Sequence, residues 1–147
     1  MWEKLIKTDA DRSALVLRVV LGVVMFAHGA QKMLGWFGGS GFGSTLEEFT
    51  SQGIPYALAV VVVLAEFFGS IGLILGVLSR VAALGIGIIM VVAIFAVHWQ
   101  YGFFMNWFGA QGGEGFEYHL LVLAICIVLF VRGSGAFSID RAMAGER

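Results

Sequence analysis

The sequence predicts an all-α integral membrane protein, a four-helix bundle whose N- and C-termini both lie in the cytoplasm. Three observations support this prediction. Of the 147 residues, 59% are hydrophobic and only 13% are charged, whereas soluble domains carry about 25% charged residues. The apolar residues form four long segments, and the lysines and arginines gather on one side of these segments. We expect one transmembrane domain covering residues 1–147.

Each apolar segment is close in length to the roughly 17–25 residues with which a helix spans a bilayer. We expect helices over about residues 13–34, 56–78, 81–98 and 116–132. The second begins after Pro55, which the first turn of a helix tolerates because its missing N–H needs no partner there. Only Ser79 and Arg80 separate the second segment from the third, so these two should form a tight antiparallel hairpin.

The basic residues predict the orientation, because lysine and arginine are enriched in cytoplasmic loops. They occur near both ends of the chain and in the turn between the second and third helices, as Lys4, Lys7, Arg12, Arg80, Arg132, Arg141 and Arg147. The other two connections, residues 35–54 and 99–115, contain neither lysine nor arginine. Both termini and the short turn should therefore face the cytoplasm, and the two long connections should face outside.

Glu66 stands in the middle of the second apolar segment. A charge at the centre of a bilayer costs about 2.5–3.5 kcal/mol on insertion scales, so such a residue is by default a candidate functional site. Small residues recur around it at helical spacing, namely Ala65, Gly69, Gly72 and Gly76. Small residues allow a neighbouring helix to come close, so this face of the helix should contact protein, and Glu66 with it.

Further ionisable residues are expected between the depth of Glu66 and the outer surface. At a rise of about 1.5 Å per residue, Glu66 lies about 15 Å from the outer end of its helix. His28 and Lys32 are four residues apart and so share one face of the first helix. The candidate residues of an outward-opening pocket for a small, quinone-like molecule are His28, Lys32, Glu66, His98, Glu117 and His119, with Arg18 and Arg80 as supporting charges. Trp36, Phe103 and Trp107 are candidates for a lid.

Each candidate also has a simpler structural interpretation. Arg18 and Lys32 can extend their charged ends to the two membrane surfaces, and Glu66 can form a structural ion pair with either of them. His98 and His119 can be interfacial polar residues. The rings of the two outer connections are typical of an aromatic belt at the membrane surface.

Other classes of site have little support. The single cysteine, Cys126, excludes an intramolecular disulfide, a CxxC redox pair and a cysteine zinc cluster. No basic patch indicates nucleic-acid binding. The histidines lack adjacent partners at ligand spacing, so no metal site is predicted, although a histidine-ligated metal or haem remains an alternative.

An ordered set of short motifs runs along nearly the whole chain. It comprises Arg18-x-x-x-Gly22, His28-Gly29 with Lys32, Gly35-Trp36-Phe37-Gly38-Gly39, Glu66-x-x-Gly69, Gly115-Phe116-Glu117-Tyr118-His119 and the closing Gly133-x-Gly135-x-Phe137-Ser138-x-Asp140. In this order the motifs resemble the DoxX family of small bacterial membrane proteins. The resemblance implies a four-helix, multi-pass protein of the bacterial inner membrane. Because the family's name comes from subunits of thiosulfate:quinone and quinol oxidoreductases, it also implies a quinone-linked role.

Three functions follow as hypotheses. The first is a component of a quinone-linked oxidoreductase, with quinone as the candidate cofactor and a redox partner protein or a second copy of the chain as the candidate partner. The second is a non-enzymatic membrane module that binds a partner protein or lipid. The third is the histidine-ligated metal or haem protein. No catalytic residue is assigned, and whether the chain is an enzyme on its own is left open.

Overall fold

The computed structural model describes residues 5–145, and all regular secondary structure in this part of the chain is helical, without strands. Its long helices are α2 (Arg12–Leu34), α4 (Tyr56–Leu75), α5 (Ser79–Ala93) and α6 (Glu117–Arg132), and its shorter ones are α3 (Gly41–Ser51) and α7 (Ile139–Met143). A π-helical turn, Ile94–His98, and a 3-10 turn, Trp99–Tyr101, continue α5, and another 3-10 turn, Trp36–Gly38, follows α2. The prediction of an all-α protein is confirmed.

Three segments are long and apolar enough to cross a membrane, namely Arg12–Leu34, Tyr56–Leu75 and Ser79–Tyr101. The fourth long helix, α6, has 16 residues. At about 1.5 Å per residue it is about 24 Å long, somewhat shorter than the roughly 30 Å hydrocarbon core of a bilayer.

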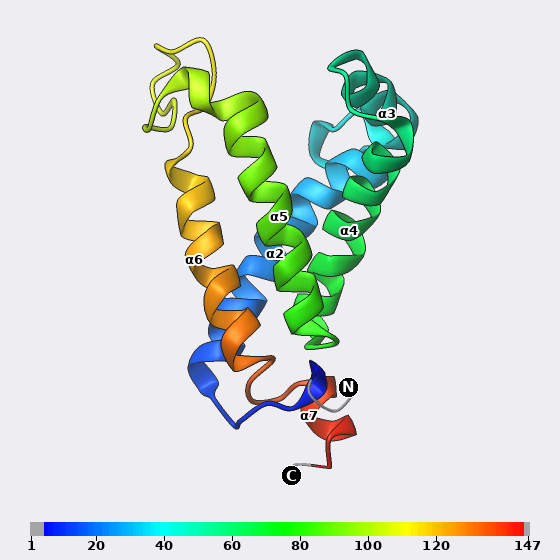
Figure 1. Cartoon of the computed structure of the whole chain (residues 1–147), viewed down its shortest axis with the longest axis vertical. Coiled ribbons are helices and arrows are strands. Elements are labelled where there is room, and N and C mark those ends of the chain that lie inside the picture. The colour runs from blue at the N-terminus through cyan, green and yellow to red at the C-terminus, as the bar shows by residue number, and fades with distance from the viewer. Residues whose placement is uncertain (1–4, 146–147) are drawn as a thin grey trace.

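The long helices are arranged as a V that opens away from the chain termini (Figure 1). One arm contains α5 and α6, and the other contains α3, α4 and the later part of α2. Helix α2 begins beside the end of α6 and crosses behind α5 to reach α4. We call these the α5–α6 arm and the α2–α4 arm.

Two glycines of α2 determine how closely α2 packs on α4. A Cβ atom added at Gly22 would lie 2.8 Å from Cγ1 of Ile74 and 3.0 Å from its backbone nitrogen. At Gly29 it would lie 2.8 Å from the Cα of Phe67. The backbones therefore approach at distances that no larger residue permits, which is how small residues promote helix association in membranes.

The small-residue face expected on α4 has several neighbours. A Cβ at Gly69 would contact Ala82 and Ile86 of α5 at 3.8 Å, whereas one at Gly72 would meet only the Val77 carbonyl of the turn that follows α4. Gly76 takes a left-handed conformation (φ 69°) as the C-cap of α4, so this helix ends at Leu75 rather than at residue 78.

Helix α3 lies within the connection over residues 35–54, which the sequence interpretation treats as an irregular loop. Phe42, Leu46 and Phe49 recur on one side of this helix and belong to an apolar cluster with Ala59 and Val63 of α4. Three glycines before α3, and two more in its first turn, masked this short amphipathic pattern in the sequence.

At the closed end of the V, Arg18 is only 1% exposed. Its Nε and two Nη atoms donate hydrogen bonds to five carbonyl oxygens, those of Leu73, Ile74, Ser134, Ala136 and Phe137, at 2.6–3.3 Å. This arginine therefore joins α2 to the end of α4 and to the chain after α6, and its charged end is enclosed by protein.

Asp140 fastens the C-terminal segment to the turn between α4 and α5. Its carboxylate accepts hydrogen bonds from the backbone N–H groups of Leu78 and Ser79, at 2.8 and 3.2 Å, and from the Ser134 hydroxyl. At the start of α2, Asp11 caps the helix by accepting from the N–H of Ser13 at 2.8 Å, and this bond lowers the pKa of Asp11 below its ordinary value.

Candidate functional site

A hollow of about 460 Å³ lies between the two arms, toward the open end of the V. Helices α2, α3, α4, α5 and α6 all contribute to its lining. Most of the lining is aliphatic, but seven titratable side chains also reach it, namely His28, Lys32, Glu66, His98, Glu114, Tyr118 and His119. We call this hollow the inter-arm pocket.

On the α2–α4 arm the pocket presents a partly buried ion pair. The Lys32 Nζ atom donates to Oε1 of Glu66 at 2.9 Å, and the two side chains are 28% and 4% exposed. Gly29 makes this pair possible, because it brings the backbone of α2 against that of Glu66 and Phe67. His28 precedes Lys32 by one turn and lines the same pocket.

On the α5–α6 arm the pocket presents two histidines, whose ring centroids are 4.1 Å apart. Nδ1 of His98 lies 2.8 Å from the carbonyl oxygen of Glu114. Because a carbonyl only accepts, this Nδ1 carries a hydrogen, and in the neutral ring Nε2 is then the acceptor. The π-helical turn that ends at His98 gives the ring its position, and such turns are frequent at functional sites.

His119 is 6% exposed, and its Nδ1 atom is buried without a hydrogen-bond partner in residues 5–145. A buried polar atom left without a partner costs about 1–3 kcal/mol, so native structures rarely leave one without a reason. His119 lines the pocket, but this Nδ1 atom is itself buried, so another part of the ring faces the hollow.

Tyr118 lies between the two groups of polar residues. Its ring centroid is 6.1 Å from that of His28 and 5.5 Å from that of His119. Its hydroxyl donates to the sulfur of Met25 at 3.8 Å. In the structure this tyrosine lines the pocket.

The pocket thus brings together five of the six residues that the sequence singles out. The sixth, Glu117, is absent from the lining, and its Oε1 accepts from the N–H of Met105 at 2.9 Å. Glu117 therefore shapes the connection over residues 99–115. Glu114 takes its place at the pocket, and the sequence reasoning missed it because an acid in a glycine-rich connection carries no periodic signal.

The two supporting arginines lie at the closed end of the V. Arg18 is held by the carbonyls described above, and Arg80 donates to the carbonyls of Phe130, Val131 and Lys7. Neither lines the inter-arm pocket.

The three rings expected as a lid do not line the pocket either. Trp36 packs edge-on against Phe26, Phe103 contacts Phe116, and Trp107 is 79% exposed. The residues at the open end of the V come instead from α3 and its C-cap, as Phe49 and Gln52, and from the connection before α6, as Met105 and Glu114.

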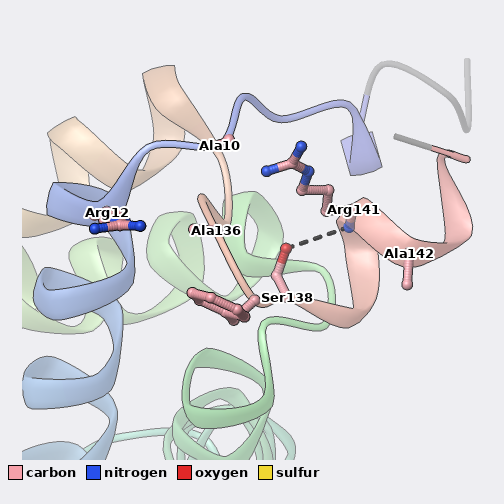
Figure 2. Close-up of a pocket in the computed structure, with 7 residues that line it drawn as sticks. Ala10, Arg12, Ala136, Ser138, Arg141 and Ala142 are labelled. Carbon is pink, nitrogen blue, oxygen red and sulfur yellow. Dashed lines mark hydrogen bonds between the residues drawn. The ribbon is translucent and has the colours of Figure 1, made fainter. Parts of the chain in front are cut away.

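A second hollow, of about 440 Å³, lies at the closed end, between the chain before α2 and the C-terminal segment (Figure 2). Arg12 and Arg141 border it from opposite sides, and the N–H of Arg141 donates to the Ser138 hydroxyl at 3.2 Å. Neither arginine is buried. The inter-arm pocket, with its buried ionisable groups, is therefore the stronger candidate site.

Residues 5–145 hold no group of three or more His, Cys, Asp or Glu side chains arranged to bind a metal ion.

Comparisons with known proteins identify the family of this chain. The family model for DoxX matches residues 13–99. The chain is 29% identical over 126 residues to the Bacillus subtilis (strain 168) protein named "Putative oxidoreductase CatD", an alignment that covers 86% of this chain and 83% of that protein. It is 26% identical over 135 residues to "Inner membrane protein YqjF" of Escherichia coli (strain K12), covering 90% and 93%. No solved structure matches. Because the family model matches more than half of the chain, this membrane protein belongs to the DoxX family.

Proposed function

We propose that this protein is a component of a quinone-linked oxidoreductase in the bacterial inner membrane, and that the inter-arm pocket is its quinone site. One observation carries the proposal. Two groups of polar residues, Lys32 with Glu66 on one arm and His98 with His119 on the other, face an apolar hollow from its two walls. A quinone has the matching shape, a flat apolar ring with an oxygen at each end.

The chemistry of a quinone requires proton donors at both ends. Reduction to the quinol adds two electrons to the ring and one proton to each oxygen. In this proposal the Lys32 ammonium donates a proton to one oxygen, and a ring nitrogen of His119 donates a proton to the other, as positioned acid–base groups do. The electrons come from a partner protein. New protons enter from the outer end of the pocket, where Gln52 and Glu114 are exposed.

The topology belongs to the same proposal. With α6 as the fourth span and both termini in the cytoplasm, the open end of the V faces outward and the pocket lies in the outer half of the bilayer. The basic residues of the two ends and of the α4–α5 turn support this orientation. The name of the B. subtilis relative supports an oxidoreductase function. The choice of a quinone as the ligand is supported by the shape and lining of the pocket alone.

The test is a binding titration of the purified protein in lipid nanodiscs with a tail-free benzoquinone. His119→Phe keeps a flat ring and removes both nitrogens, and it should raise the Kd at least about tenfold, the equivalent of one lost buried hydrogen bond. Glu66→Gln should also weaken binding. Glu48→Gln, an exposed change on α3 outside the pocket, is the control. Wild-type protein that binds no quinone, or two pocket variants that bind like the control, would refute the proposal.

A second function has one observation in its favour. Phe104, Trp107 and Phe108 are 67%, 79% and 96% exposed, so the connection over residues 99–115 presents large rings outward instead of covering the pocket. Such a surface suits a partner protein or lipid, as in the non-enzymatic alternative. If the titration shows no quinone binding while replacing Trp107 and Phe108 by serine abolishes association with a co-purifying protein, this second function is the better one.

A further inference from the structure

The inter-arm pocket has a second opening, between α4 and α5. Leu58 of α4 and Ile88 and Val92 of α5 all line the pocket, yet they are 51%, 57% and 54% exposed. A side chain that lines a hollow and is also half exposed stands at its mouth. The pocket therefore opens sideways between these helices, as well as at its outer end.

The packing of the helices explains this slot. Helices α4 and α5 contact each other near their shared turn, where Gly69 faces Ala82 and Ile86. Farther out they separate (Figure 1), because Gly22 and Gly29 hold α4 against α2 while α5 follows α6. On α4 the slot runs from Leu58 past Val62 to Glu66, about 12 Å at the rise of an α-helix.

The surroundings of the slot determine what can pass through it. Both helices belong to segments that are long and apolar enough to cross a membrane, so the slot opens toward the acyl chains of the bilayer. The side chains at its mouth, Leu58, Ile88 and Val92, are all aliphatic and offer no hydrogen bond. An apolar chain fits such a mouth, whereas a charged or strongly hydrated group has no partner there.

We propose that the slot between α4 and α5 admits an amphiphilic ligand from the bilayer and holds its apolar tail. The ligand has a small polar head, which reaches Lys32, Glu66 and His119, and a long hydrocarbon or isoprenoid tail, which lies in the slot and extends from it into the lipids. The nature of the head rests on the function proposed above. The presence of a tail rests on the slot alone.

The first experiment compares two probes with the same head group, a tail-free benzoquinone and its decyl-tailed form, in nanodiscs. Ile88→Trp and Leu58→Trp should obstruct the mouth. Val16→Trp is the matched control, because Val16 is 59% exposed on α2 and lies outside the pocket. We expect the mouth variants to raise the Kd of the tailed probe about tenfold or more relative to any change in that of the tail-free probe. Unchanged binding of the tailed probe, or equal weakening of both probes, would overturn the proposal.

A second experiment does not depend on quinone binding. Val62→Cys, in a Cys126→Ala background, is placed inside the slot and treated with an alkyl-tailed maleimide or a charged, impermeant one. The alkyl reagent should react much faster than the charged reagent, and adding Ile88→Trp should slow it at least severalfold. If the alkyl reagent is no faster, or Ile88→Trp does not slow it, the slot does not hold a tail. If neither benzoquinone binds but this labelling pattern holds, the quinone function fails and the slot stands.

Discussion

Two buried charges of this protein, Arg18 and Glu66, are satisfied to very different degrees. A guanidinium has five N–H groups to donate, and Arg18 makes five hydrogen bonds to carbonyls, so its capacity is used up by the fold. The Glu66 carboxylate has two oxygens, and its hydrogen bond within residues 5–145 is the one from Lys32 to Oε1. Glu66 therefore keeps acceptor capacity at the pocket, and Arg18 is structural.

The Lys32–Glu66 pair leads to a prediction about stability. Lys32→Met removes the charge that compensates a carboxylate only 3% exposed. Leaving a buried ion without its partner costs about 3–5 kcal/mol. We expect a clear fall in the melting temperature of the purified protein in detergent.

The matching control is the double variant Lys32→Met with Glu66→Leu, which replaces both charges by apolar groups of similar size. Apolar replacement of a buried pair is often neutral, so the double variant should recover most of the lost stability. If it melts as low as the single variant, the loss comes from the packing of Lys32, and Glu66 is not an uncompensated charge.

At the scale of the elements, α2 is the helix that builds the site. Its glycines bring it onto α4. His28, which directly precedes Gly29, and Lys32, three residues after it, thereby reach the pocket. The close packing of α2 on α4 therefore also sets the geometry of the site. A single methyl group added at Gly29 should disturb both.

Gly29→Ala tests this coupling. Its Cβ would lie 2.8 Å from the Phe67 Cα, a backbone atom that cannot move aside cheaply. We expect a loss of about 1–3 kcal/mol, the usual cost of overpacking, together with weaker ligand binding in the titration described above.

Gly85→Ala is the matched control for this prediction. It lies within α5, where an added Cβ has no atom within 4 Å. Alanine is favoured over glycine in a helix by about 0.5–1 kcal/mol, so this variant should be unchanged or slightly more stable. Equal effects of the two substitutions would show that α2 and α4 are not held at close contact by Gly29.

Much of the helix arrangement along the chain could be predicted from the sequence, because the length of an apolar segment and the spacing of small residues are local properties of the chain. The shared face of His28 and Lys32 and the contact of Gly69 with another helix were also predictable in this way. The sequence could not predict that Glu114 rather than Glu117 reaches the pocket. That outcome depends on how an irregular, glycine-rich connection folds back on α5 and α6. The V shape could not be predicted from the sequence either, since it results from which helices pair rather than from any single segment.

At the scale of the whole molecule, the hydrogen bonds at the closed end explain why the V opens at the other end. Arg18 and Asp140 tie the chain after α6 to the end of α4 and to the α4–α5 turn. No comparable polar network connects the arms near Leu58 and Val92 in the described residues. The fixed end therefore coincides with the basic residues, and the open end coincides with the connections that lack them.

This coincidence predicts the orientation in the membrane, with the closed end in the cytoplasm and the open end outside. Single cysteines in a Cys126→Ala background provide the test in intact bacterial cells. Ser44 and Gln111 are exposed at the open end, and Met143 is 56% exposed at the closed end. Ser44→Cys and Gln111→Cys should react with an impermeant maleimide before lysis, whereas Met143→Cys should react only afterwards.

Labelling at Met143→Cys alone would reverse the topology, move the pocket to the inner half of the bilayer and require protons to come from the cytoplasm. Labelling of all three cysteines before lysis would show that α6 does not complete a fourth span in the way we propose.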